Sequence, residues 1–429
     1  MIYKRQVIFS GLFFLTTYFF SLFSVDIQVE AVKHARVKLL VCMVGKKNKD
    51  LQVVAQQIAR NLAFSRQFSV EVEYLTRLRK NQDVKTFFDR GFPLVLFLNQ
   101  EKRSVYEWRL YDAECASMIA GKKYRKRGRD VREWAHHITD SAWPVLTGKA
   151  GFFSTKIAYC KEVRRPGKKP FKHIYVADYD GSNEKLLVST PTVNVAPCWN
   201  RDSSNPLLFY SEHTNQNVRL VSVDMKGRRR VVSNFDGINM LPAFSPDGKQ
   251  VVFCASRGGG TCQLYYFAKG VFKKLTFNSG NNIAPTFSQD GKTLFFCSDF
   301  ETKGPQIYSY SFETEKQKRI TNGGYCVSPS CSPGNNALAY AKMVRGVMQI
   351  FLYDLNTKKH RQVTFNAGNK EECSWSPCGN YLMFAVETSK ESRLALLNLI
   401  SEDCQFVTSR GAICCYPAWS CPYRNFWGA

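Results

Sequence analysis

The sequence predicts a protein of two parts, an α/β N-terminal domain followed by an all-β six-bladed β-propeller. The first observation is a repeat: the stretch Pro242–Gly248, which reads PAFSPDG and precedes an apolar run, returns as Pro285–Gly291, which reads PTFSQDG. The second is a mixture of helical and strand patterns before residue 150. The third is the length of 429 residues, which exceeds one ordinary core. Together they indicate an α/β domain followed by a repeat domain.

The repeat is regular over the second part of the chain. Taking the proline before the aromatic residue as an anchor, the anchors follow at steps of 43 to 45 residues. They are Pro197, Pro242, Pro285, Pro329, Cys373 (in place of proline) and Pro417. A second series in step with them starts alternating strands: Ile174, Leu220, Leu264, Ile307, Ile350 and Leu394. A period of about 44 residues with four short strands per unit is typical of a propeller blade.

The two ends of the repeat region complement each other. No strands follow the last anchor, whereas the strands between Thr155 and Ser189 lack an anchor. We expect the two ends to combine into the sixth blade, so that strands from both ends of the domain close the ring and remove its free edges. A solenoid, the alternative, would leave open ends that need polar caps. The predicted divisions are 1–24 (signal peptide), 25–150 (α/β domain) and 151–429 (propeller).

The segment before residue 150 is predicted element by element. Apolar or alternating runs predict strands over 37–44, 68–75, 93–98 and 105–111, and a short helix over 84–89. A helix capped by Asp50 has its apolar face at Leu51, Val54, Ile58 and Leu62.

The last predicted helix of this segment begins at Asp130, with Glu133 at the capping-box position. Its buried face consists of Val131, Trp134, Ala135, Ile138 and Ala142. We expect a kink or an end near Ala142, because Pro144 lacks an N–H and clashes with the preceding turn.

The first residues resemble a targeting segment. Lys4 and Arg5 precede an uncharged run from Val7 to Phe23, which is the pattern of a secretory signal peptide. An uncleaved membrane anchor is the alternative, because the run is close to the ~18 residues at which a span becomes possible. Both interpretations export the rest of the protein.

The net charge of +25 predicts an anionic partner or surface. Export argues against nucleic acid and favours an anionic lipid, a cell-wall polymer or an acidic protein. The basic clusters within 122–129, 164–172 and 228–230 are each predicted as a solvated edge strand or hairpin tip, where charge blocks edge pairing.

The fifteen cysteines predict neither a metal site nor a dedicated disulfide framework. Several stand where other repeats carry small residues, which favours buried small apolar side chains. Two pairings stay open: Cys254 with Cys262, and Cys414 or Cys415 with Cys421. No Cys/His spacing is typical of zinc.

Neither a catalytic site nor a cofactor is predicted. The adjacent His136 and His137 point about 100° apart on a helix, so one is expected to be buried and the other exposed. A peptidase attached to a propeller would need an α/β-hydrolase domain with a G-x-S-x-G motif, which the sequence lacks.

Asparagines precede three of the anchors by three residues. Asn194, Asn239 and Asn282 occupy these positions. Two interpretations are open: asparagine suits the turn backbone there, or the amides form a ring that faces a bound partner.

The junction between the two predicted domains resembles a known family. The segments Arg132–Asp140 and Leu146–Tyr159 closely resemble the corresponding junction of the TolB family, the periplasmic propeller component of the Tol–Pal system. The segment Tyr106–Asp112 and the PAFSPDG repeats are similar too. The resemblance covers nearly the whole chain after the signal. Repeat four lacks the Asp, and repeat five carries Cys373 and Cys378.

The resemblance implies a non-enzymatic periplasmic adaptor, a monomer peripheral to membranes. Such a protein links TolA in the inner membrane to the peptidoglycan-associated lipoprotein Pal, and supports outer-membrane integrity and constriction during cell division. The TolA-binding segment maps to Val25, Asp26, Ile27, Gln28, Val29 and Glu30. The Pal-binding funnel loops carry Asn194, Ile238, Asn239, Asn282 and Ile283. A carbohydrate- or cell-wall-binding propeller is the alternative function.

Overall fold

The computed structural model describes residues 36–422, except 47, 78–81, 103–104, 126–129, 165–166, 168–169, 203, 258–259 and 303. The predicted signal peptide and the predicted TolA-binding residues Val25–Glu30 lie outside this range. Among the described residues, no helix combines the length and the apolarity that crossing a membrane requires.

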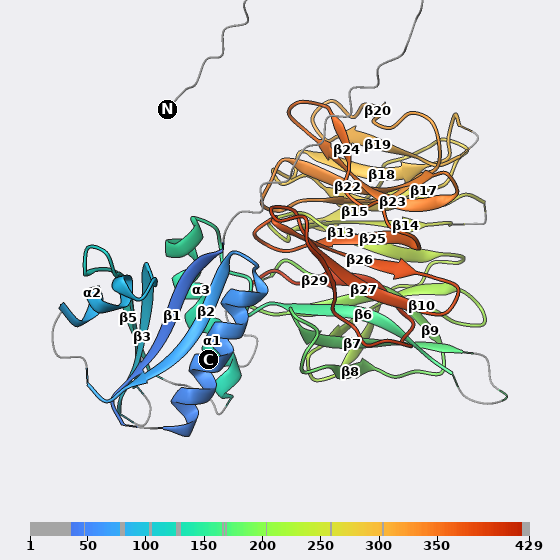
Figure 1. Ribbon diagram of the computed structural model, residues 1–429. Helices are drawn as coiled ribbons and strands as arrows, with labels where there is room; N and C mark the ends of the chain where they lie inside the picture. Colours follow the sequence, from blue (N-terminus) through green and yellow to red (C-terminus); the bar gives the residue numbers. More distant parts are fainter. Residues whose placement is uncertain are drawn as a thin grey trace, which may run out of the picture. The chain divides into compact units, whose positions relative to one another are not determined.

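An α/β region comes first, built on a five-stranded sheet of order β2-β1-β3-β4-β5 (Figure 1). Its strands are β1 (Val37–Val44), β2 (Phe68–Leu75), β3 (Leu94–Lys102), β4 (Val105–Asp112) and β5 (Ser117–Arg125). Its helices are α1 (Lys49–Phe64), α2 (Gln82–Asp89) and α3 (Val131–Thr147). Side chains of α1 and α3 pack on one face of the sheet and those of α2 on the other. Helices therefore cover both faces.

The predicted elements of this region are present, with one different cap and one additional strand. Leu51, Val54 and Ile58 of α1 are buried as predicted. The cap is Asn48, whose Oδ1 accepts the N–H of Asp50 at 2.8 Å, so the prediction of Asp50 was wrong. The unpredicted strand is β5, at the edge of the sheet.

Helix α3 begins as predicted but continues past Pro144. Asp130 is the N-cap, and the helix runs to Thr147 before Gly148 ends it in the left-handed region with φ of 70°. Of the predicted kink or end near Ala142, the end was wrong, because the helix continues to Thr147. Trp143 is fully buried against the Phe152 and Phe153 rings, with centroids 5.9 and 5.1 Å away. This packing outweighs the single helix hydrogen bond that proline removes.

Four separate four-stranded antiparallel sheets make up most of the β region. They are β13–β16 (Asn239–Phe244, Gln250–Ala255, Gln263–Ala268, Val271–Lys274), β17–β20 (Asn282–Phe287, Thr293–Ser298, Gln306–Ser311, Gln317–Arg319), β21–β24 (Cys326–Cys331, Ala337–Val344, Val347–Asp354, His360–Gln362) and β25–β28 (Asn369–Trp375, Tyr381–Glu387, Ser392–Asn398, Cys404–Phe406).

An eight-stranded sheet contains the remaining strands. They are β6–β8 (Lys156–Val163, Phe171–Asp178, Lys185–Val188), β9–β12 (Val193–Trp199, Leu207–His213, Val218–Asp224, Arg229–Ser233) and β29 (Cys414–Trp419). The last strand, β29, pairs antiparallel with β6, the first strand of the β region. A single parallel pair, Lys172 with Val193, joins the β6–β8 half to the β9–β12 half.

The two repeat series lie where the periodicity places them. Each anchor belongs to the first strand of a run of four, namely β9, β13, β17, β21, β25 or β29. Every member of the second series is buried: Ile174, Leu220, Leu264, Ile307, Ile350 and Leu394. The repeat therefore identified both the innermost and the third strands.

Eight of the fifteen cysteines are buried, and so is one of the two adjacent histidines. All fifteen cysteines are free, Cys254 and Cys262 among them although both are buried. Neither open pairing therefore forms in this structure. His136 is buried and His137 exposed, as predicted.

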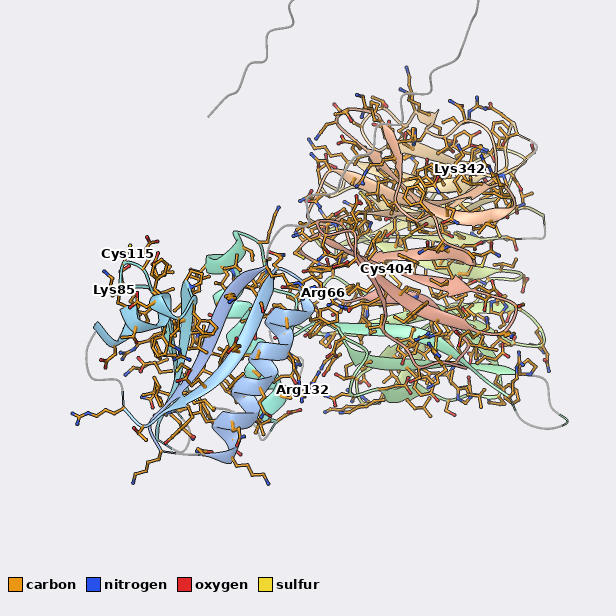
Figure 2. All side chains as sticks on the ribbon, in the orientation of Figure 1. Arg66, Lys85, Cys115, Arg132, Lys342 and Cys404 are labelled. Carbon is orange, nitrogen blue, oxygen red and sulfur yellow. The ribbon has the colours of Figure 1, made fainter. Side chains whose placement is uncertain are left out.

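A buried ion-pair cluster joins α3 to the end of β7. Asp178, with a side chain 3% exposed, accepts Arg132 Nε at 2.9 Å and Lys156 Nζ at 2.5 Å. Arg132, labelled in Figure 2, also contacts Asp180 at 3.0 Å. Burial by itself would raise the pKa of Asp178, but the nearby His136 ring and the Lys156 ammonium group outweigh it and lower that pKa below its usual range.

Candidate partner-binding site at the centre of the propeller

A cavity of about 490 Å³ lies at the centre of the β region and is lined by all six anchor strands. In each strand, the residue just before the anchor has a positive φ of 52° to 61° without being glycine: Ala196, Leu241, Ala284, Ser328, Glu372 and Tyr416. The pairing of each strand with its neighbour shifts register at this point. These are β-bulges, which bend a strand and increase its twist. The proline anchors suit a position where the ladder is interrupted.

Hydrogen bonds join neighbouring anchor strands around the cavity. The Cys331 N–H donates to Thr286 Oγ1 at 3.2 Å, and the Trp419 N–H donates to Ser374 Oγ at 2.8 Å. In each of these bonds the donor follows the acceptor by 45 residues, about one repeat. Trp199 Nε1 donates to the Ala418 carbonyl at 3.0 Å, which joins β9 to β29. The repeat thus places donor and acceptor in register between strands of successive units.

The Ser-Pro-Asp-Gly motif forms a turn directly after the anchor strand. Ser245 Oγ donates to Asp247 Oδ1 and accepts the Gln250 N–H, at 2.5 and 3.0 Å. Gly248 closes the turn with φ of 71°. Repeat three makes the same bonds. Both side chains are used within the turn, so the motif is architectural.

The three predicted asparagines lie at the opposite end of the anchor strand and are fully buried. Asn194 Nδ2 donates to the Lys172 carbonyl at 2.9 Å, Asn239 Nδ2 to the Phe235 carbonyl at 2.7 Å, and Asn282 Nδ2 to the Gly280 carbonyl at 3.1 Å. These bonds fit the first interpretation, in which asparagine organises the turn backbone. In this conformation no amide of the three is presented at a surface.

Lys370 occupies the equivalent position in repeat five and likewise donates hydrogen bonds to loop carbonyls. Its side chain is buried, and Nζ donates to the carbonyls of Asn366, Ala367 (2.9 Å) and Gly368 (2.8 Å). Burial lowers the pKa of Lys370. An ammonium group in place of an amide therefore satisfies the same kind of loop carbonyls.

The two predicted isoleucines are partly exposed. Ile238 N–H donates to Ser256 Oγ at 3.0 Å, which ties its loop to the next one. Ile283 packs on two apolar clusters through part of its side chain. Of the five predicted funnel residues, these two have side chains that a partner can reach.

The same loops also carry exposed aromatic residues, which were not predicted from the sequence as site residues. Phe277 is 75% exposed, Phe365 is 74% exposed and Tyr325 is 43% exposed. Each lies between the fourth strand of one sheet and the anchor strand of the next. Such loops share one face of a propeller, because the anchor strands all run in the same direction.

A buried threonine directs each phenylalanine outward. Thr276 Oγ1 accepts the Leu264 N–H at 2.9 Å, and Thr364 Oγ1 accepts the Ile350 N–H at 2.8 Å. Each phenylalanine directly follows such a buried threonine and is itself exposed. The sequence signal was the triplet Thr-Phe-Asn, which occurs at 276–278 and again at 364–366.

No metal centre accompanies this site. Within the described part of the chain, no three or more His, Cys, Asp or Glu side chains are placed to hold a metal ion. Burial raises the pKa of two cavity-lining thiols, Cys198 to about 11 and Cys331 to about 12, so both remain protonated at neutral pH. The arrangement offers hydrogen-bonding and apolar contacts.

Comparisons with known proteins agree with this architecture. The TolB from Acinetobacter baumannii is a solved structure that superimposes with a TM-score of 0.76 at 24% identity, covering 90% of this chain and 96% of that one. At that identity it shows the fold. The Tol-Pal system protein TolB of Rickettsia africae (strain ESF-5) is 34% identical over 153 residues, and that of Rickettsia felis 33%.

Those sequence alignments cover 35% of this chain and 34% of each relative, so the match spans about a third of their length. The family model of the TolB beta propeller domain matches much more, residues 143–423. That range is about two thirds of the chain and contains every anchor strand. The chain therefore belongs to the TolB beta-propeller family.

Proposed function

We propose that the protein is a non-enzymatic periplasmic adaptor of the Tol–Pal system, whose propeller loops bind the peptidoglycan-associated lipoprotein. The observation that carries the proposal is the set of exposed aromatic residues Phe277, Tyr325 and Phe365 on hydrogen-bonded loops at one face. Aromatic side chains dominate the energetics of protein interfaces, and rigid loops lose little entropy on binding. The related proteins are named for the same system.

We infer that the propeller has six blades. Each half of the eight-stranded sheet has four strands, β29 with β6–β8 in one half and β9–β12 in the other, and a parallel bridge joins the halves. Counted as two blades, these halves bring the total to six with the four separate sheets. The hydrogen bond from Trp199 to the Ala418 carbonyl supports closure between the first and last anchor strands. The proposed divisions stay at 25–150 and 151–429, after a signal at 1–24.

The same proposal assigns a binding segment to each of the two partners that the protein would link. The segment Val25–Glu30 would bind a TolA-type inner-membrane protein, while the loops with Ile238, Ile283 and the aromatic residues bind the lipoprotein. Asn194, Asn239 and Asn282 would contribute by holding those loops. Such a link supports outer-membrane integrity and constriction during division, and a monomer suffices for it.

A pull-down tests the proposal. Immobilised protein is incubated with envelope extract, and recovered peptidoglycan-associated lipoprotein is quantified. The double variant Phe277→Ser/Phe365→Ser is expected to reduce recovery by about tenfold or more, because each exposed aromatic anchor contributes about 1–2 kcal/mol.

The matched control is Phe406→Ser, which removes another exposed phenylalanine (52% exposed) from the outer strand β28. Its recovery should equal that of the unchanged protein. Retention of purified glycan without any lipoprotein would instead support the alternative, a cell-wall-binding propeller.

A further inference from the structure

Two cysteines face each other where the first and last strands of the β region pair. Cys415 of β29 lies directly opposite Cys160 of β6 in the antiparallel register. Opposite residues in such a ladder have their Cα atoms about 4.5–5.5 Å apart, within the range of about 4.4–6.8 Å that disulfides span. Their side chains point to the same face of the sheet.

The surroundings of the pair activate one sulfur and shield the other. Lys172 Nζ lies 3.4 Å from Cys415 Sγ. The hydrogen bond from Cys160, followed by the Lys172 charge, lowers the pKa of Cys415 to about 7 against the opposing effect of burial. Burial raises the pKa of Cys160 well above its usual range. Cys415 is half-buried and thus reachable, whereas Cys160 is fully buried.

We propose that Cys160 and Cys415 form a redox-active dithiol that small-molecule disulfides convert into a covalent link between β6 and β29. The Cys415 thiolate attacks one sulfur of a disulfide such as oxidised glutathione, and one glutathione thiolate leaves. Cys160 then gives up its proton to that thiolate and attacks Cys415 Sγ, which expels the second glutathione. The chain is oxidised by two electrons, and one disulfide is reduced to two thiols.

The consequence is a covalently closed ring. The β29–β6 ladder holds the two ends of the β region together without a covalent bond, and a disulfide there would enclose almost the whole region in one loop. Long enclosed loops lose the most chain entropy in the unfolded state, so oxidation should stabilise the ring. By contrast, Cys254 and Cys297 do not lie opposite a cysteine in their ladders: Cys254 lies opposite Met240, and Cys297 opposite Ile283.

Peptide mapping of the full chain tests the proposal. The reduced protein is incubated with oxidised glutathione, quenched with N-ethylmaleimide and digested without reductant. A peptide containing Cys160 linked to one containing Cys415 is expected. In the Cys160→Ser variant, glutathione should stay attached at Cys415. Absence of the linked peptide, or glutathione spread equally over Cys115 and Cys404, would overturn the proposal.

Alkylation kinetics provide a second readout that needs no disulfide. At neutral pH, Cys415 should react about tenfold faster than Cys115, one of the two exposed cysteines labelled in Figure 2. Lys172→Met should remove most of that advantage, and equal rates in the two proteins would contradict the assigned role of Lys172. Oxidation should raise the urea midpoint of the unchanged protein and leave that of Cys160→Ser where it was.

Discussion

The buried charge of Asp178 offers the sharpest test of how the α/β region is joined to the propeller. In Asp178→Asn the carboxylate that accepts Arg132 Nε and Lys156 Nζ becomes an amide. The amide brings donors toward two cations that are themselves 20% and 9% exposed. Breaking one partner out of a buried ion pair costs about 3–5 kcal/mol, and we expect a loss of that size at pH 7.

The pH dependence of this loss has a definite sign. Because the pKa of Asp178 is lower in the folded protein than in the unfolded chain, its stabilisation is fully present above the unfolded pKa of about 4. It is lost as the pH falls below that value. The difference in unfolding free energy between the protein and Asp178→Asn should therefore be constant from pH 7 to about pH 5 and shrink below about pH 4.

Urea titration followed by tryptophan fluorescence measures the loss, since Trp143 of α3 and Trp419 of β29 are both buried. Asp224→Asn is the matched control. It removes an equivalent ion pair, with Arg228 at 2.6 Å, but Arg228 is 78% exposed. Exposed pairs contribute about 0–1 kcal/mol. A loss below about 1 kcal/mol in Asp178→Asn, equal to the control, would refute a stabilising role for the cluster.

Three further substitutions test the anchor strands and their loops by urea midpoint. Burial and the neighbouring Cys415 raise the pKa of Glu372 to about 8, so the free energy of unfolding should fall as the pH rises from about 5 to 8. Glu372→Gln should remove about 1–3 kcal/mol of that fall. The same pH dependence of stability in the variant would contradict this assignment. Lys370→Met leaves three loop carbonyls unpaired, so we expect the free energy of unfolding to fall by about 1–3 kcal/mol. The amides of residues 363–368 should exchange hydrogen faster, and unchanged exchange would exclude a role for Lys370 in holding the loop. Gly248→Ala places a Cβ at φ of 71° and should cost about 1–2 kcal/mol, whereas a neutral result would mean that the turn relaxes.

The propeller was predictable because the residues of its repeat each satisfy a local structural requirement that recurs in every unit. The anchor proline suits a bulge, and the Ser-Pro-Asp-Gly turn closes on its own side chains. Strand β5 was not predictable in that way. Ser117–Arg125 is mostly exposed and basic, and pairing with β4 determines it rather than any apolar alternation of its own. Of the basic cluster within 122–129, the described part, 122–125, lies on an edge strand, one of the two places predicted for it.

Helix α3 shows why local rules failed elsewhere. A proline ends a helix when nothing else holds the last turn, but here Trp143 is buried between aromatic rings that arrive later in the chain. The exposed residues of the proposed partner surface were hard to predict for the same reason. Which side chain of a loop is exposed depends on a hydrogen bond to another strand, such as Thr276 Oγ1 with the Leu264 N–H. The three asparagines selected from the sequence are buried, whereas Ile238 and Ile283 are partly exposed. That these loops form the contact surface stays a prediction.

The division of labour within these loops has an energetic reason. A side chain that holds loop carbonyls, such as Asn239 or Lys370, has to be buried to do so, and it thereby fixes the backbone that carries the exposed residue. In the proposed complex, binding requires little further ordering, so that the contact energy of Phe277 and Phe365 is not offset by loop entropy. Four repeats carry asparagine or lysine three residues before the anchor, whereas the other two carry Cys326 and Cys414. Substitutions at Lys370 and Phe365 should therefore weaken binding by different routes, the first through loop mobility and the second through lost contact.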